Sequence, residues 1–263
     1  SMPDIGDTLL IDPNSTQTYT SKRDYIRSAI TVLQRQGVRW PIGLEIVIRS
    51  EIPINAGVSS SSAMTVMWLR LLLETGESTI EFDTEKIARF AYAAEVTEFR
   101  EPGGMMDHFA CAVGGVIAVD TVSPFKCVSL PFSWDGFVIG NSEEPKATIE
   151  TLLSRRNEVR EGIRQIKSKL PQFQLATTPY DECLPYLSMV DEMPRKRLIA
   201  NLNNRDITKL AHEAIVGGDM VRFGNLLNSH HIQLRDGLDL STPKLEAMLN
   251  ASLEAGALGG KVN

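Results

Sequence analysis

Cysteine is scarce in this sequence, and the cysteines present form no pattern. Cys111, Cys127 and Cys183 are the three cysteines among 263 residues, an odd and widely spread set without a CxxC pair. Such a set argues against a disulfide framework and against a zinc site made of cysteines, because both need paired or clustered thiols. The cysteine usage is typical of a reducing compartment, and we expect a cytoplasmic enzyme or binding protein.

A basic excess and long apolar runs are also missing. The 27 Lys and Arg residues stand against 33 Asp and Glu, a formal net charge of −6, whereas nucleic-acid binders usually carry a basic excess. No run approaches the roughly eighteen apolar residues of a membrane-spanning helix, and the N-terminus lacks the pattern of a signal peptide. We therefore expect a globular protein with neither a nucleic-acid nor a membrane partner.

Neither terminus carries a structural end signal. Ser1-Met2 resembles a remnant of cloning, and Gly259-Gly260 near the other end is typical of the approach to a strand. We therefore expect that further sequence precedes and follows these residues.

Hydrophobic periodicity predicts more helices than strands. Helices are expected at residues 22–36, 63–73, 107–113, 145–170, 207–214, 220–232 and 243–255, and in one further segment with an N-cap at Thr84. Strands are expected at residues 44–49, 116–119 and 137–140, and a loop at 171–186. Because strands lie early and helices late, without regular βαβ alternation, the predicted fold class is α+β rather than a doubly wound sheet.

A loop rich in glycine and serine lies between a predicted strand and a predicted core helix. Residues 53–63 read PINAGVSSSSA. Small residues let the backbone approach a ligand, and the unpaired N–H groups of a helix start favour phosphate. A serine N-cap is the alternative interpretation, although one serine would suffice for it. The loop is neither GxxxxGK[ST] nor GxSxG, so a P-loop and a nucleophile elbow are excluded.

Two carboxylates follow this loop at a distance. Glu95 falls late in a predicted helix, and Asp107 follows Gly103-Gly104 at the start of another. Taken singly, Glu95 fits a solvated helix position and Asp107 fits an N-cap. Taken with the serine loop, the two carboxylates form a set for magnesium binding and proton abstraction, in which a hydroxyl and one carboxylate bind the metal.

The same segments resemble a known family of enzymes. PINAGVSSSSA is similar to the PxxxGLxSSxA phosphate loop of the GHMP kinases. Residues 95–115, EVTEFREPGGMMDHFACAVGG, resemble the galactokinase pattern in which a glutamate precedes CGIMDQ and a helix of small residues. Later similarities occur at residues 141–142, 155–156, 203–205, 229–236 and 256–261.

The resemblance implies the two-lobed α+β fold of the GHMP kinases. We expect an N-terminal β/α domain at residues 1–134 and a ferredoxin-like C-terminal domain at residues 135–263, each incomplete at its outer end. It also implies ATP-dependent phosphorylation of a monosaccharide at the anomeric hydroxyl, with ATP and Mg²⁺ as cofactors. The partner is expected to be a small-molecule sugar, and the protein a monomer or weak homodimer.

The resemblance further implies a role for each site residue. Asp107 would take the proton from the sugar hydroxyl as it attacks the γ-phosphate. Ser61 and Glu95 would bind Mg²⁺. The ATP phosphates would be held by Gly57, Ser59, Ser60 and Ser61. Catalysis would rest on positioning and charge neutralisation, since phosphoryl transfer needs little covalent help from the protein.

Departures from the family pattern concern the substrate. The Gly-Glu-His-Thr-Asp stretch of the first family motif, which supplies sugar contacts, does not occur, and no GxGxGG loop is present. His108 replaces the glutamine that follows the catalytic aspartate. The alternative functions are therefore a kinase-like sugar-binding regulator without turnover and a small-molecule kinase of another GHMP branch, such as a polyol or isoprenoid kinase.

The histidines offer no stronger alternative. A hydrolase built from Ser60, His108 and Asp107 is disfavoured, because nothing in the sequence orients the histidine. His230 and His231 are adjacent on a predicted helix and point about 100° apart, which favours hydrogen-bonded packing over a metal pair.

Overall fold

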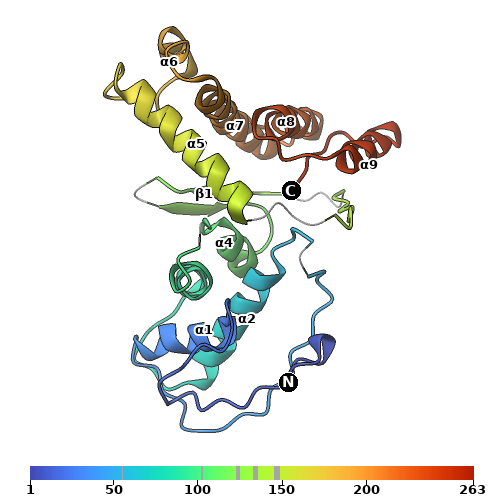
Figure 1. Cartoon of the computed structure of the whole chain (residues 1–263). Coiled ribbons are helices and arrows are strands. Elements are labelled where there is room, and N and C mark those ends of the chain that lie inside the picture. Colours follow the sequence, from blue (N-terminus) through green and yellow to red (C-terminus); the bar gives the residue numbers. More distant parts are fainter. Residues whose placement is uncertain (55, 102, 123–124, 133–135, 145–148) are drawn as a thin grey trace. The chain divides into compact units, whose positions relative to one another are not determined.

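The computed structural model describes the chain except for residues 55, 102, 123–124, 133–135 and 145–148 and the side chains of residues 149–150 (Figure 1). The described residues form two compact units. The N-terminal unit contains Ser1–Val119 and Cys127–Ser129, and the C-terminal unit contains Asp120–Lys126 and Leu130–Asn263. The expected domain boundary between residues 134 and 135 falls outside the described residues and stays a prediction.

Helices are the main regular elements of the N-terminal unit. They are α1 (Tyr25–Gln34), α2 (Ser60–Thr75), α3 (Thr84–Tyr92) and α4 (Met106–Val113), with a short 3-10 turn (Pro3–Ile5) and a π-helical turn (Ala93–Thr97) directly after α3. Each helix predicted for this unit is confirmed. The predicted N-cap at Thr84 is wrong: Asp83 caps α3, because its carboxylate accepts the N–H of Lys86 at 2.7 Å.

The core of the N-terminal unit is formed by the apolar faces of α1, α2 and α3. The stripe predicted for α1 is buried, and α2 buries most of its length, as predicted for a core helix. Two indole N–H groups donate to the backbone of these helices, Trp68 to the carbonyl of Ile26 at 3.1 Å and Trp40 to that of Leu72 at 2.9 Å. Both bonds satisfy buried indoles, and the bond from Trp68 fixes α2 against α1.

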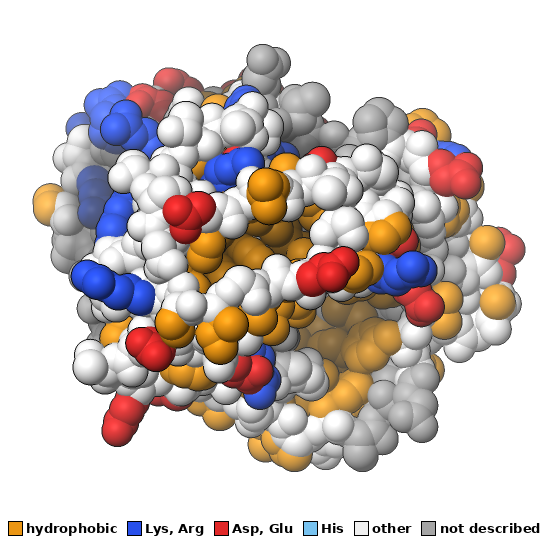
Figure 2. All heavy atoms as spheres, turned by 90° about the horizontal axis from the view of Figure 1, so that it is seen from below, with side chains coloured by type: hydrophobic (Ala, Val, Ile, Leu, Met, Phe, Trp, Pro, Cys, Tyr) orange, Lys and Arg blue, Asp and Glu red, His pale blue; other side chains and the backbone are white. Residues whose placement is uncertain are grey.

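An apolar hollow of about 480 Å³ lies among α2, α3 and α4. Its lining includes Val66, Met67 and Ile87. Figure 2 shows that hydrophobic side chains line hollows in the face that it views. Neither Ser61 nor Glu95 lines this cavity, so it is separate from the residues singled out by the sequence.

The described strands are short. β1 (Ile117–Asp120) and β2 (Lys126–Ser129) pair as a two-stranded sheet, so the strand predicted at residues 116–119 is confirmed with a shift of one residue. The strands predicted at residues 44–49 and 137–140 are wrong. Ile46 and Ile48 pack on the core, but the backbone hydrogen bonds of this segment go to Ser1, so no ladder forms there among the described residues.

The C-terminal unit is helical. It contains α5 (Ile149–Lys167), α6 (Tyr180–Leu187), α7 (Glu192–Val216), α8 (Met220–Ile232), a π-helical turn (Gln233–Gly237) and α9 (Pro243–Glu254). The limits predicted for α8 are confirmed, whereas residues 145–148 of the expected long helix lie outside the described residues. The loop predicted at residues 171–186 is wrong at its end, where α6 forms despite Pro185, and α7 is longer than predicted. Among the helices described in either unit, none combines the length and the apolar character that crossing a bilayer requires.

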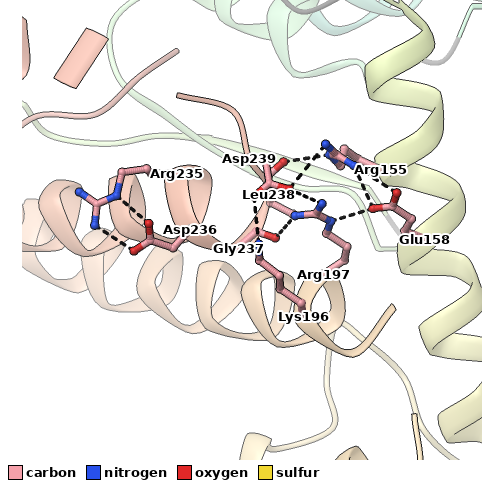
Figure 3. A network of polar contacts seen from close by, with 9 residues as sticks. All are labelled: Arg155, Glu158, Lys196, Arg197, Arg235, Asp236, Gly237, Leu238 and Asp239. Atoms are coloured by element: carbon pink, nitrogen blue, oxygen red, sulfur yellow. Dashed lines mark hydrogen bonds and ion pairs between the residues drawn. The ribbon is translucent and has the colours of Figure 1, made fainter. Parts of the chain in front are cut away.

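A buried arginine links the elements of the C-terminal unit. The side chain of Arg197 on α7 is completely buried and donates to Glu158 of α5 at 2.7 Å, to the carbonyl of Gly237 at 2.6 Å and to Asp239 (Figure 3). Arg155 adds a bond from α5 to the carbonyl of Leu238 at 3.0 Å. Two helices and the turn after α8 are therefore joined through one guanidinium group.

We expect the stability of the protein to depend on pH through His230, which lies near the end of α8. Burial, with smaller contributions from Lys261 and His231, lowers the pKa of His230 from its ordinary 6.5 to about 4. Between these two values the unfolded chain binds a proton that the folded protein does not, so stability falls as the pH falls from 6.5 to about 4. We expect the urea midpoint to drop across this window and to drop less in His230→Gln; equal slopes for the two proteins would contradict the assignment.

His231, by contrast, has the hydrogen-bonded packing role expected of the histidine pair. It is buried, its Nε2 lies 2.9 Å from Glu246 Oε1, and its Nδ1 accepts the N–H of Val262 at 3.3 Å. Both ring nitrogens are thus engaged in joining α8 to α9 and to the end of the chain.

Candidate active site

The serine-rich loop leads into α2 through two residues with left-handed backbone. Gly57 has φ +80°, and Ser59, the N-cap residue, has φ 57° and ψ 37°. A non-glycine residue in this region is strained and is often found at binding sites. A serine thus occupies the N-cap position, as the alternative interpretation expects, but its side chain makes no capping hydrogen bond. Asn55 of this loop lies outside the described residues.

The first turn of α2 is bound to a buried carboxylate. The hydroxyl of Ser61 donates to Glu95 Oε1 at 2.6 Å. Glu95 is 8 % exposed and belongs to the π-helical turn Ala93–Thr97, an irregularity that frequently marks functional sites. The structure therefore brings together the serine and the glutamate that the sequence predicts as a pair, while their role as metal ligands stays a prediction.

Glu95 has a second partner on α4. His108 Nε2 lies 2.9 Å from Glu95 Oε2, and the imidazole is buried. Burial alone would raise the pKa of Glu95, but the hydrogen bonds from His108 and Ser61 outweigh it, so the pKa lies below its ordinary value. Glu95 is thus a buried carboxylate, and its interpretation as a solvated helix position is wrong.

Asp107 lies at the start of the same helix as His108. It is the second residue of α4, it is half-buried, and the N-cap position belongs to Met105. The interpretation of Asp107 as an N-cap is therefore wrong. Burial raises the pKa of the Cys111 thiol, one turn further along α4, and the charges of Asp107 and Glu95 raise it further.

These elements converge because their helices pack on one another. α2 contacts both α4 and the π-helical turn, and α3 contacts α4. The start of α2, the π-helical turn and the start of α4 thereby bring Ser61, Glu95 and the Asp107-His108 pair into one region of the N-terminal unit. The sequence alone does not predict which of these side chains contact one another, because their contacts depend on how the helices pack.

The donor set suits magnesium more than a softer metal. The described residues hold no group of three His, Cys, Asp or Glu side chains arranged for a metal ion. Ser61 and Glu95 offer a hydroxyl and a carboxylate oxygen only 2.6 Å apart. Mg²⁺ prefers such oxygen ligands and usually completes its shell with water and substrate phosphates, so two protein ligands are sufficient.

Sequence reasoning missed the role of His108. The argument that nothing orients this histidine is wrong, since Glu95 does so. The hydrolase triad of Ser60, His108 and Asp107 is nevertheless not formed. His108 Nε2 is bound to Glu95, and its Nδ1 has no hydrogen-bond partner among the described residues, so the histidine is not the base for a serine. The sequence did show that His108 replaces the glutamine of the family motif, and this replacement could have marked His108 as a residue of the site.

Comparisons with known proteins agree with these motifs. Residues 24–115 match the family model described as GHMP kinases N terminal domain. Galactokinase of Lactococcus lactis subsp. cremoris is 26% identical over 248 residues, which are 91% of this chain and 61% of the relative. Galactokinase of Clostridium perfringens is 23% identical, with 91% and 63% covered.

Solved structures show the same fold. A crystal structure of Lactococcus lactis galactokinase complexed with galactose has a TM-score of 0.77 at 23% identity and covers 98% of this chain and 68% of its own. A crystal structure of L. major mevalonate kinase in complex with R-mevalonate has a TM-score of 0.59 at 19% identity, with 91% and 64% covered.

Residues 24–115 are therefore similar to the N-terminal domain of the GHMP kinases, and the chain shares the α+β fold of the solved galactokinase structure. Among the proteins compared, the galactokinases resemble it over most of its length, as the motifs predicted. It spans about three fifths of the length of the curated galactokinases that it matches.

Proposed function

We propose that the protein transfers the γ-phosphoryl group of ATP to a monosaccharide, at the anomeric hydroxyl. The observation that carries this proposal is the hydrogen bond between half-buried Ser61, in the first turn of α2, and buried Glu95, with Asp107 on the helix that packs against α2. The similarity to galactokinases supports the substrate class and the direction of transfer.

The start of α2 provides the phosphate site in this proposal. The loop before it is built from small residues, and the first N–H groups of a helix have no partner within the helix. They would donate to ATP phosphates, and the helix dipole would favour the negative charge. Gly57, Ser59, Ser60 and Ser61 are the residues that would line this site.

Ser61 and Glu95 would hold Mg²⁺. The ion would neutralise charge on the phosphates. The hydrogen bond between the hydroxyl and the carboxylate, together with a pKa of Glu95 below its ordinary value, supports this assignment. Little ordering would remain to be done when the metal–nucleotide complex arrives, which favours tight binding.

Asp107 would act as the general base. Its carboxylate would accept the proton of the sugar hydroxyl while the hydroxyl oxygen forms its bond to the γ-phosphorus and the bond to the oxygen of ADP breaks. The half-buried position at the start of α4 allows a charged group to meet substrate without complete exclusion from water. General base catalysis of this kind contributes about 10²- to 10⁴-fold.

The test of this function is an assay of ADP release by the intact protein over a panel of monosaccharides. We expect magnesium-dependent turnover with one or a few sugars and an acid-labile sugar 1-phosphate as product. Binding of sugar and nucleotide without ADP release would instead identify a regulator. Turnover with a polyol or an isoprenoid alcohol alone would identify another branch of the GHMP kinases.

Replacing Glu95 tests the metal site separately. Glu95→Gln keeps size and one acceptor but removes the charge, and we expect magnesium-dependent nucleotide binding to weaken by roughly 10- to 100-fold. Calorimetry with and without magnesium would measure this. The control is Glu98→Gln, because Glu98 is bound by Tyr19 and Arg35 rather than by Ser61; an equal loss in both variants would remove Glu95 from the metal site.

A further inference from the structure

His108 is fixed on all sides in the N-terminal unit. It is 2 % exposed, and its ring meets Tyr92 edge-on, with ring centroids 5.7 Å apart and an interplanar angle of 86°. Nε2 lies 2.9 Å from Glu95 Oε2. The imidazole therefore has one polar contact in a site that is otherwise packed.

The direction of the hydrogen bond follows from the charge of its partner. An ionised carboxylate only accepts hydrogen bonds, so His108 Nε2 carries the hydrogen and donates it to Glu95. Nδ1 is buried and has no hydrogen-bond partner among the described residues. Placing an imidazole here at the expense of an unsatisfied nitrogen is costly, which argues that the bond to Glu95 has a purpose beyond filling space.

The two oxygens of Glu95 are thereby made unequal. Oε2 is bound by His108 at 2.9 Å, and Oε1 lies 2.6 Å from the hydroxyl of Ser61. A rotation of the carboxylate plane away from this orientation would break the bond to His108 in a buried site. One carboxylate oxygen is consequently kept beside Ser61.

We propose that His108 is a positioning residue for Glu95: it holds Oε2, so that Oε1 and the hydroxyl of Ser61 together face the metal of a metal–nucleotide complex. The proposal rests on the proposed function. It assigns to His108 the place of the outer-shell hydrogen-bond donors that orient ligands at metal sites, whose loss commonly costs about 10- to 100-fold in metal affinity.

The experiment compares two variants of similar shape. Gln has an amide N–H that reaches about as far as His Nε2, whereas Met has the same length and no donor. The probe is Mn²⁺ bound in the presence of a non-hydrolysable ATP analogue, followed by electron paramagnetic resonance with the intact protein. We expect the apparent Kd for Mn²⁺ to rise by roughly 10- to 100-fold in His108→Met and by less than about threefold in His108→Gln.

Each outcome decides between roles. Equal Mn²⁺ affinity in wild type and His108→Met, with only the melting temperature lowered, would make His108 a packing residue and overturn the proposal. Equal weakening in both variants would also overturn it, because the donor would not be what matters. Absence of Mn²⁺–nucleotide binding in the wild-type protein would instead refute the proposed function, and the role of His108 with it.

Discussion

Replacing Asp107 by asparagine should lower kcat by at least about 10²-fold and change nucleotide affinity little. Asparagine keeps the size of the side chain but cannot accept the proton of the sugar hydroxyl. The fold has little to lose, because Met105 is the N-cap residue of α4 and Asp107 contributes at most the favourable interaction of a charge with the helix dipole, about 0.3–1 kcal/mol. Steady-state ADP release and calorimetric titration of nucleotide measure the two quantities.

Asp181→Asn is a matched control for this variant. Asp181 is also the second residue of an eight-residue helix, α6, so its substitution removes the same interaction with a helix dipole. We expect a similar small loss of stability in both variants and a loss of kcat in Asp107→Asn alone. Full activity of Asp107→Asn would return Asp107 to a structural role, and a parallel fall in both variants would point to stability rather than chemistry.

Much of the helical structure could be predicted because its signals are local. α8 has the limits predicted from its periodicity, and its N-cap Asp219 accepts the N–H of Arg222 three residues later. The segment at residues 44–49 shows the opposite case. A strand was predicted there, and Ile46 and Ile48 do pack against the core. A strand also needs a partner ladder, and the sequence of one segment does not specify the partner.

The site could be predicted in part for a similar reason. The loop, Glu95 and Asp107 follow one another at a spacing that can be compared with a family motif, and the resemblance to that motif assigned the site residues. The burial of Glu95 and its contact with His108 depend on the packing of a π-helical turn against α4, which periodicity does not predict. From the sequence, Glu95 could be explained as a solvated helix residue and Asp107 as an N-cap. The fold contradicts both explanations.

The largest expected effect on stability comes from Arg197. Arg197→Met should lower the free energy of unfolding of the C-terminal unit by about 3 kcal/mol, since removal of one partner leaves a buried ionic network uncompensated. The expected loss lies at the low end of the range for such networks, because the side chains of Glu158 and Asp239 are 25% and 42% exposed and water can solvate them. Hydrogen exchange of amides in α5 and α7 measures this, because it reports opening of one unit separately.

Two further variants separate the contributions of charge and geometry. Lys196→Met removes a cation bound to the same Asp239, but this pair is about 40% exposed on both sides, so at most about 1 kcal/mol is expected. Arg197→Lys keeps the charge but not the planar fork, and an ammonium group on a shorter reach cannot bond Glu158, Gly237 and Asp239 together. We expect its loss to approach that of Arg197→Met. If Arg197→Lys were as stable as wild type, charge alone would hold α5, α7 and the turn after α8, and the fork geometry would be irrelevant.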